Sequence, residues 1–122
     1  MVDETSMVAP HNGAFSRVLG RHVRERGDLD LTTALAKMTS LPASRLARFF
    51  PRFARKGRVS VGADADLTVF DPARVRDRAT YGNPFQASAG IRTVIVAGQV
   101  ALDEGSVVED VYAGRMLLNT PE

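Results

Sequence analysis

Two histidines, His11 and His22, are the only candidates in this sequence for proton transfer near neutral pH. They stand eleven positions apart. Neither belongs to a His-x-His or His-Glu-x-x-His motif, in which two imidazoles bind one metal ion. We therefore interpret His22 as a half-buried helix residue and His11 as a loop residue.

Asp64 and Asp66 form an Asp-x-Asp motif, which could bind a divalent cation. Calcium takes about six to eight oxygen ligands, however, and this stretch offers two carboxylates. Carboxylates at a turn more often accept hydrogen bonds from nearby backbone amides. We therefore predict that both aspartates are structural.

Other catalytic motifs are missing from the sequence. The serines include no Gly-x-Ser-x-Gly elbow, and the glycines form neither a Gly-x-Gly-x-x-Gly fingerprint nor a P-loop. Cysteine is absent, which excludes disulfides and thiolate zinc sites and is compatible with a reducing cytoplasm. No apolar run approaches the ~20 residues of a membrane span, and the first residues lack the pattern of a secretory signal. We expect a soluble, cytoplasmic chain without a membrane partner.

One stretch, residues 45–58, interleaves basic and aromatic side chains. Such an arrangement can bind single-stranded nucleic acid through charge and base stacking. Helical spacing, however, would point the phenylalanines inward and the arginines outward, as in any amphipathic helix. We therefore predict no nucleic-acid partner. The residues concerned are Arg45, Arg48, Phe49, Phe50, Arg52, Phe53, Arg55, Lys56 and Arg58.

Hydrophobic spacing predicts three helices in the first half of the chain. They run from Gly13 to Gly27, from Leu31 to Thr39 with Asp30 or Thr32 as N-cap, and from Ala43 to Phe50. Pro42 fits the first turn of the third helix. The residues expected to be buried are Phe15, Val18, Leu19 and Val23 in the first helix, and Leu31, Ala34, Leu35 and Met38 in the second.

After Pro51 the pattern indicates strands. Residues 58–61 and 66–70 alternate polar and apolar side chains around a turn at 62–65, which predicts a hairpin. A turn-rich stretch at 73–90 follows. Residues 92–96 and 99–102 then predict a second hairpin across Ala97-Gly98, closed by Gly105, before a last turn or short helix at 111–118.

Helices followed by strands predict an α+β fold. We divide the chain into a helical segment, residues 1–55, and a β segment, residues 56–122, that together form one compact unit. A chain of this length can bury a modest core.

Four motifs in order resemble the C-terminal region of metal-dependent amidohydrolases, most closely the N-acyl-D-amino-acid deacylases. They are His-x-x-x-Phe-x-Arg-x-Leu-Gly at 11–20, Ala-x-x-Lys-Met-Thr-Ser-x-Pro-Ala-x-Arg-Leu at 34–46, the Lys-Gly to Asp-Ala-Asp-Leu segment at 56–72, and Gly-Ile-Arg-Thr-Val-Ile-Val-Ala-Gly at 90–98. The sequence departs from the family in two places: the Pro-Arg after the histidine is missing, and Ala97-Gly98 replaces Asn-Gly.

The resemblance implies that the helices are the end of a catalytic barrel and that the strands belong to a small antiparallel β-sandwich. In such enzymes a zinc-type metal, held by histidines and a carboxylate, activates water to cleave an amide bond. By its spacing ahead of His11, Asp3 matches the family's proton-shuttling catalytic aspartate. The other metal ligands have no counterpart in this sequence, so we expect no metal cofactor in this chain and no catalysis by it alone.

Two partners follow from this interpretation: a barrel-bearing chain that this sequence lacks, or further copies of the chain in a homo-oligomer. The alternative function is a stand-alone interaction or self-associating module without enzymatic activity, because a chain separated from its barrel would expose apolar faces and strand edges.

Overall fold

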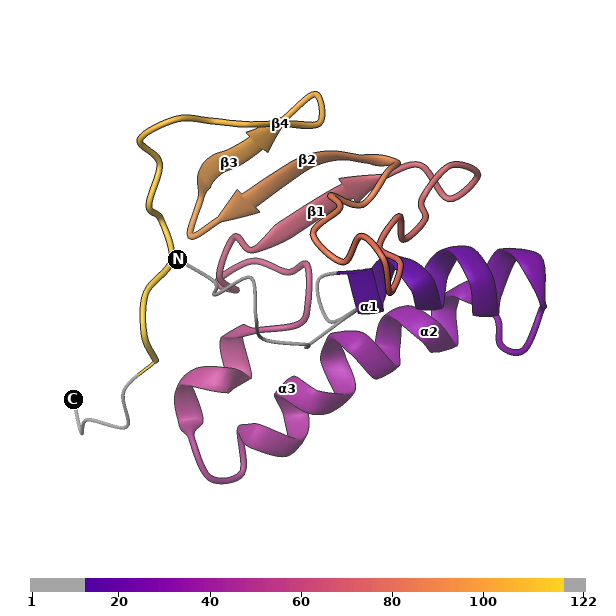
Figure 1. Ribbon diagram of the computed structural model, residues 1–122. Coiled ribbons are helices and arrows are strands. Elements are labelled where there is room, and N and C mark those ends of the chain that lie inside the picture. The colour runs from indigo at the N-terminus through magenta and orange to yellow at the C-terminus, as the bar shows by residue number, and fades with distance from the viewer. Residues whose placement is uncertain (1–12, 118–122) are drawn as a thin grey trace.

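A set of helices packs beneath one face of a small antiparallel sheet (Figure 1). The structure, a computed structural model, describes residues 13–117. In chain order the elements are α1 (Ala14–Arg17), the π-helix η2 (Val18–Glu25), α2 (Leu31–Met38), α3 (Ser40–Leu46), the 3₁₀-helix η3 (Pro51–Arg55), β1 (Leu67–Phe70), β2 (Ile91–Val96), β3 (Gln99–Asp103) and β4 (Ser106–Val107). The predicted α+β class is confirmed.

The first two predicted helices are present. α1 and η2 form one continuous helical run whose last turns are wound as a π-helix, a feature that hydrophobic spacing does not predict. The run ends before Gly27. Asp30 caps α2 as expected, because its carboxylate accepts the backbone N–H of Thr33 at 2.9 Å. Of the residues expected to be buried, however, Phe15 is 67% exposed.

The third helix differs from the prediction at both ends. α3 begins at Ser40, with Pro42 in its first turn, and ends at Leu46. The chain then turns, and the backbone N–H groups of Phe49 and Phe50 both donate to the Leu46 carbonyl. Phe50 is extended because it precedes Pro51, and a residue before proline avoids the helical conformation. The predicted inward direction of the phenylalanines is also wrong for Phe49, which is 72% exposed.

The predicted hairpin of residues 58–61 with 66–70 is wrong. Residues 60–63 form a turn in the region where the first strand was expected, and residues 51–55 ahead of it form η3. The backbone N–H of Asp64 donates to the Arg55 carbonyl and closes the intervening residues into a loop. β1 therefore takes its antiparallel partner from β2, more than twenty positions further along the chain.

The second hairpin is confirmed, and the sheet continues one strand further than expected. β2 pairs with β3, and β3 with the short β4 across a turn at Glu104-Gly105, giving the order β1-β2-β3-β4. Residues 73–90 are irregular, as predicted, apart from one bridge between Arg76 and Ala89. The turn or short helix expected at 111–118 is not a helix over residues 111–117, and residue 118 lies outside the described residues.

The β2–β3 turn holds an alanine in a left-handed conformation, with φ of +50° at Ala97 and +81° at Gly98. Two positive φ values in succession define the type I′ turn, where asparagine is preferred at the first position. We expect Ala97→Asn to raise the free energy of unfolding by about 1 kcal/mol, because asparagine tolerates this conformation better than alanine. Urea denaturation measures the change. The same substitution at the exposed Ala87 should be neutral, and an equal gain at both positions would contradict the explanation.

The core between helices and sheet is narrow. Leu19, Ala34 and Val75 form the buried cluster, and Val75, at 1% exposure, is the one large side chain buried completely among the described residues. Phe70 and Ile91 contribute from the first two strands. The small core leaves many large apolar side chains on the surface. Among the described residues, no helix is long and apolar enough to cross a membrane.

Candidate functional site

The predicted catalytic Asp3 and the loop residue His11 lie outside the described residues, so their predicted roles stay predictions. His22 is half-buried in η2, as expected. Its Nδ1 atom lies 2.8 Å from Asp28 Oδ2. This hydrogen bond, with a smaller contribution from Arg26, lowers the pKa of the Asp28 carboxyl below its ordinary value. His22 is therefore engaged with one carboxylate just beyond the end of its own helix.

A zinc site needs three or four converging ligands. Within residues 13–117, no group of three histidine, cysteine, aspartate or glutamate side chains is close enough to hold a metal ion. The His22–Asp28 pair provides two donors only. The described residues therefore do not fit the metal centre that the resemblance implies for the full-length family.

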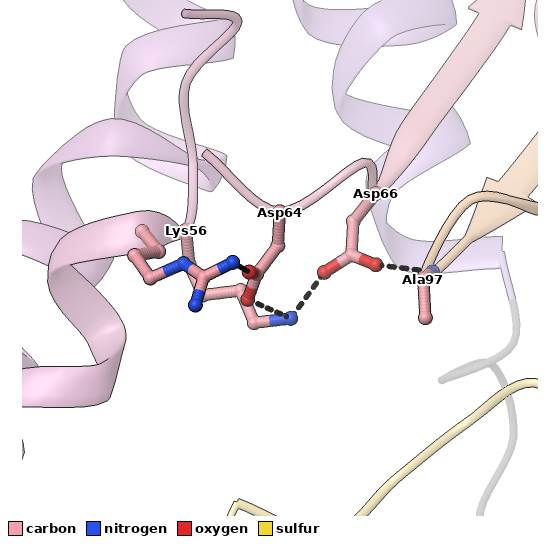
Figure 2. Close-up of polar contacts among 5 residues, drawn as sticks. Lys56, Asp64, Asp66 and Ala97 are labelled. Carbon is pink, nitrogen blue, oxygen red and sulfur yellow. Dashed lines mark hydrogen bonds and ion pairs between the residues drawn. The ribbon is translucent and has the colours of Figure 1, made fainter. Parts of the chain in front are cut away.

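The Asp64–Asp66 motif instead surrounds a lysine (Figure 2). Lys56 Nζ lies 3.0 Å from Asp64 Oδ2 and 2.5 Å from Asp66 Oδ2. Arg55 Nη2 also contacts Asp64, at 2.9 Å from Oδ1. The second oxygen of Asp66 accepts the backbone N–H of Ala97 at 2.8 Å. A cation of the protein itself thus occupies the position between the two carboxylates, which supports the structural interpretation of both aspartates.

This network connects three parts of the fold. Lys56 follows η3, Asp66 precedes β1, and Ala97 lies in the β2–β3 turn. A backbone hydrogen bond from Gly98 to the Ala65 carbonyl, at 3.0 Å, reinforces the last connection. The motif that resembles the family's Asp-Ala-Asp-Leu segment therefore attaches the helical segment to the sheet.

The network makes stability depend on pH. The hydrogen bond from Lys56, followed by that from Ala97, lowers the pKa of Asp66 below its ordinary value of 3.8. A carboxyl whose pKa is lower in the folded state stabilises the fold above its unfolded pKa, and this contribution is lost as the pH falls through the folded pKa. The pKa of Lys56 is raised above its ordinary value of 10.5, chiefly by its hydrogen bond to Asp66. An amine whose pKa is higher in the folded state stabilises the fold below its unfolded pKa, so the stabilisation by Lys56 is lost as the pH rises above 10.5 and through the folded pKa.

We therefore expect Asp66→Asn to lower the free energy of unfolding by about 1 kcal/mol at pH 7. This value allows for solvent screening of the partly exposed Lys56–Asp66 pair. The difference from wild type should begin to shrink as the pH falls below 3.8 and should vanish below the lower pKa of the folded Asp66 carboxyl, where the wild-type side chain is itself protonated. Urea denaturation at several pH values measures it. Asp110→Asn, which removes an exposed carboxylate outside the network, is the matched control, and a pH-independent difference for Asp66→Asn would rule out the ion pair as its cause.

A second ion pair joins the first helical run to the irregular stretch at 73–90. Arg17 donates to Asp77 Oδ2 from Nε at 2.8 Å and from Nη2 at 2.5 Å. The Asp77 side chain is only 5% exposed, and its other oxygen accepts the backbone N–H of Ala79 at 2.8 Å. Gly13 lies so close that a Cβ atom there would overlap the Asp77 carboxylate. Sequence reasoning missed this pair because its members are 60 positions apart.

The two networks hold elements of the fold in place. The described part of the chain is therefore suited to positioning structure.

Comparison with known proteins assigns the class. The model of the amidohydrolase family matches residues 5–102, and the chain belongs to that family. Within the family it is a D-aminoacylase-like amidohydrolase. The resemblance inferred from the four sequence motifs is thereby confirmed.

The chain is 55% identical over 86 residues to an N-acyl-D-glutamate deacylase, and 42% identical over 108 residues to a D-aminoacylase, both from Alcaligenes xylosoxydans xylosoxydans. These alignments cover 70% and 88% of this chain but 17% and 21% of the relatives. The chain thus spans about a fifth of the length of the relatives it matches.

Solved structures agree with this assignment. A D-aminoacylase crystal structure superposes with a TM-score of 0.77 and 42% identity, covering 86% of this chain and 21% of that one. An N-acyl-D-glutamate deacylase from Bordetella bronchiseptica gives a TM-score of 0.65 and 45% identity over 78% of this chain and 20% of its own length. That enzyme was solved with zinc and a phosphonate inhibitor that mimics the tetrahedral intermediate.

Proposed function

We propose that this chain is the C-terminal part of a hydrolase that cleaves the carbon–nitrogen amide bond of N-acyl-D-amino acids, and that it is not catalytic alone. The observation that carries the proposal is the superposition on a D-aminoacylase with a TM-score of 0.77 over only 21% of that enzyme. In this assignment α1 to η3 are the end of the catalytic barrel and the sheet belongs to a β-sandwich. The location is cytoplasmic.

The role of the described residues in that enzyme is structural. The Lys56 network fixes the sheet to the helices, and the Arg17–Asp77 pair fixes the helical run that directly follows the segment carrying Asp3 and His11. Zinc, which the N-acyl-D-glutamate deacylase structure contains, can activate a water molecule for hydrolysis. Because residues 13–117 do not fit such an ion, the remaining part of the enzyme supplies it, and Asp3 is the one catalytic residue that we assign to this chain.

Complementation tests the proposal. A D-aminoacylase shortened by the fifth that matches this chain is co-expressed with the 122-residue chain, and hydrolysis of N-acetyl-D-glutamate and N-acetyl-D-methionine is followed. We expect chelator-sensitive hydrolysis only when both parts are present. The Asp3→Asn chain should bind the shortened enzyme without restoring hydrolysis. If the wild-type chain neither binds the shortened enzyme nor restores its activity, the proposal fails.

A second candidate function is an interaction module, either for a barrel-bearing chain or for further copies of itself. It is favoured by the large apolar side chains on the surface, among them Val59, Val61, Tyr81 and Tyr112, which are 87% to 107% exposed. Side chains of this size in such numbers commonly mark a surface that binds another protein.

A further inference from the structure

The charges of this chain are unevenly distributed along the sequence. Residues 31–63, which contain α2, α3 and η3, carry seven basic and no acidic side chains. The seven are Lys37, Arg45, Arg48, Arg52, Arg55, Lys56 and Arg58. Two of them, Arg55 and Lys56, are paired with Asp64. A positive surface therefore remains at the end of α3.

At that end an aromatic ring lies among the arginines. Phe49 is 72% exposed in the turn between α3 and η3, and Arg45, Arg48 and Arg52 flank it in sequence. Arg45 and Arg48 line one shallow surface hollow together with Ser44. We call Arg45, Arg48, Phe49 and Arg52 the basic corner.

The hairpin of β3 and β4, with the residues just after it, carries the opposite charge to the basic corner. Residues 103–110 contain four acidic side chains, Asp103, Glu104, Glu109 and Asp110, and no basic one. Val107 lies between them in sequence and is 77% exposed. We call these five residues the acidic hairpin. Glu104 is paired with Arg92, at 2.7 Å, which leaves three carboxylates to give the surface its negative charge.

The two surfaces lie at opposite ends of the molecule, since α3 is at the bottom of Figure 1 and β4 at the top. They cannot meet within one chain. We propose that the basic corner of one copy binds the acidic hairpin of the next, so that the chain self-associates head to tail through opposite charges around Phe49 and Val107. Such a heterologous contact builds rings or open chains of copies instead of a closed two-fold dimer.

A second copy explains both surfaces, whereas a polyanion such as nucleic acid explains only the basic corner and is repelled by the acidic hairpin. The small area and exposed charges indicate weak binding, with a dissociation constant on the order of 10–100 µM. The proposal does not depend on the hydrolase role, because it concerns the isolated chain.

Sedimentation velocity of the 122-residue chain at increasing concentration tests it. We expect the average mass to rise above 13.2 kDa at low salt and to return to the monomer value at high salt, where charges are screened. The double variant Arg45→Glu/Arg48→Glu should weaken association by roughly tenfold, and Asp103→Lys/Glu109→Lys by a similar factor. The control Arg76→Glu/Arg78→Glu makes the same charge change outside both surfaces and should associate like wild type.

Mixing the two double variants tests whether the contact is head to tail. The basic-corner variant keeps a native acidic hairpin, and the acidic-hairpin variant keeps a native basic corner, so an equimolar mixture should associate more strongly than either variant alone. A wild-type chain that stays monomeric at low salt would overturn the proposal. So would association that either double reversal leaves at wild-type strength, a mixture that associates no more strongly than the variants alone, or assembly that occurs only after a polyanion such as heparin is added.

Discussion

Replacing Gly90 with alanine is expected to lower the free energy of unfolding by about 3 kcal/mol, the largest loss that we predict for a single methyl group in this chain. Two costs combine. Gly90 has φ of +80°, which is unfavourable for a residue with a Cβ atom. A Cβ atom there would also lie 2.4 Å from the backbone nitrogen of Val75 and 2.5 Å from the carbonyl carbon of Arg74. These backbone atoms belong to the segment that places Val75 in the core, so they cannot move without loss of packing.

Gly98→Ala separates the two costs. Gly98 has nearly the same φ, +81°, but no atom lies within 4 Å of a Cβ atom built there. We expect Gly98→Ala to lower the free energy of unfolding by only about 1 kcal/mol, because it carries the cost of the positive φ without a steric overlap. Thermal and urea denaturation of both variants measure the difference. If Gly90→Ala costs no more than Gly98→Ala, the close approach of residues 74–75 is not a constraint on the fold.

Asp77→Asn is expected to cost about 2 kcal/mol, because it places an uncharged amide against the Arg17 guanidinium in a mostly buried site. Asparagine has the same size as aspartate and keeps an oxygen that can accept the Ala79 backbone N–H. The decrease in the free energy of unfolding therefore measures the loss of the Arg17–Asp77 ion pair. The expected decrease in stability is smaller than for a fully buried ion pair, because the Arg17 side chain is 35% exposed.

A double-mutant cycle with Arg17→Met checks this assignment. If the pair is the cause, Arg17→Met and Asp77→Asn together should cost clearly less than the sum of the two single changes. Additive effects measured by urea denaturation would show that the two side chains stabilise the fold independently, contrary to the contact in the structure.

Local signals in the sequence predicted part of this fold well. Asp30 at the start of α2 and Ala97-Gly98 between β2 and β3 act through neighbouring residues, so capping and turn rules apply to them directly. Residues 58–61 show where such rules fail. Their alternation is typical of a strand, but the bond from Asp64 to Arg55 and the pairing of β1 with β2 decide their conformation, and neither contact is visible in a local pattern.

The candidate site shows the same contrast between contacts that a local sequence pattern can predict and contacts between distant residues. The prediction that Asp64 and Asp66 are structural rested on two carboxylates being too few ligands for a calcium ion, and their contacts with Lys56 support it. Their partner Lys56 could have been proposed from its charge and its place in the same motif. The Arg17–Asp77 pair could not, since 60 positions and an irregular segment separate its members. Phe49 was misplaced because helical spacing was extended beyond Leu46, where the helix has already ended.

The proposal that this chain is a non-catalytic part of a hydrolase is tested most directly by asking whether the chain hydrolyses an amide bond without another protein. Incubation of the purified 122-residue chain with N-acetyl-D-glutamate and zinc, followed by measurement of the released D-glutamate, decides this. We predict release no faster than in buffer, and no effect of a chelator. Release of D-glutamate that the chelator abolishes and zinc restores would contradict the central claim.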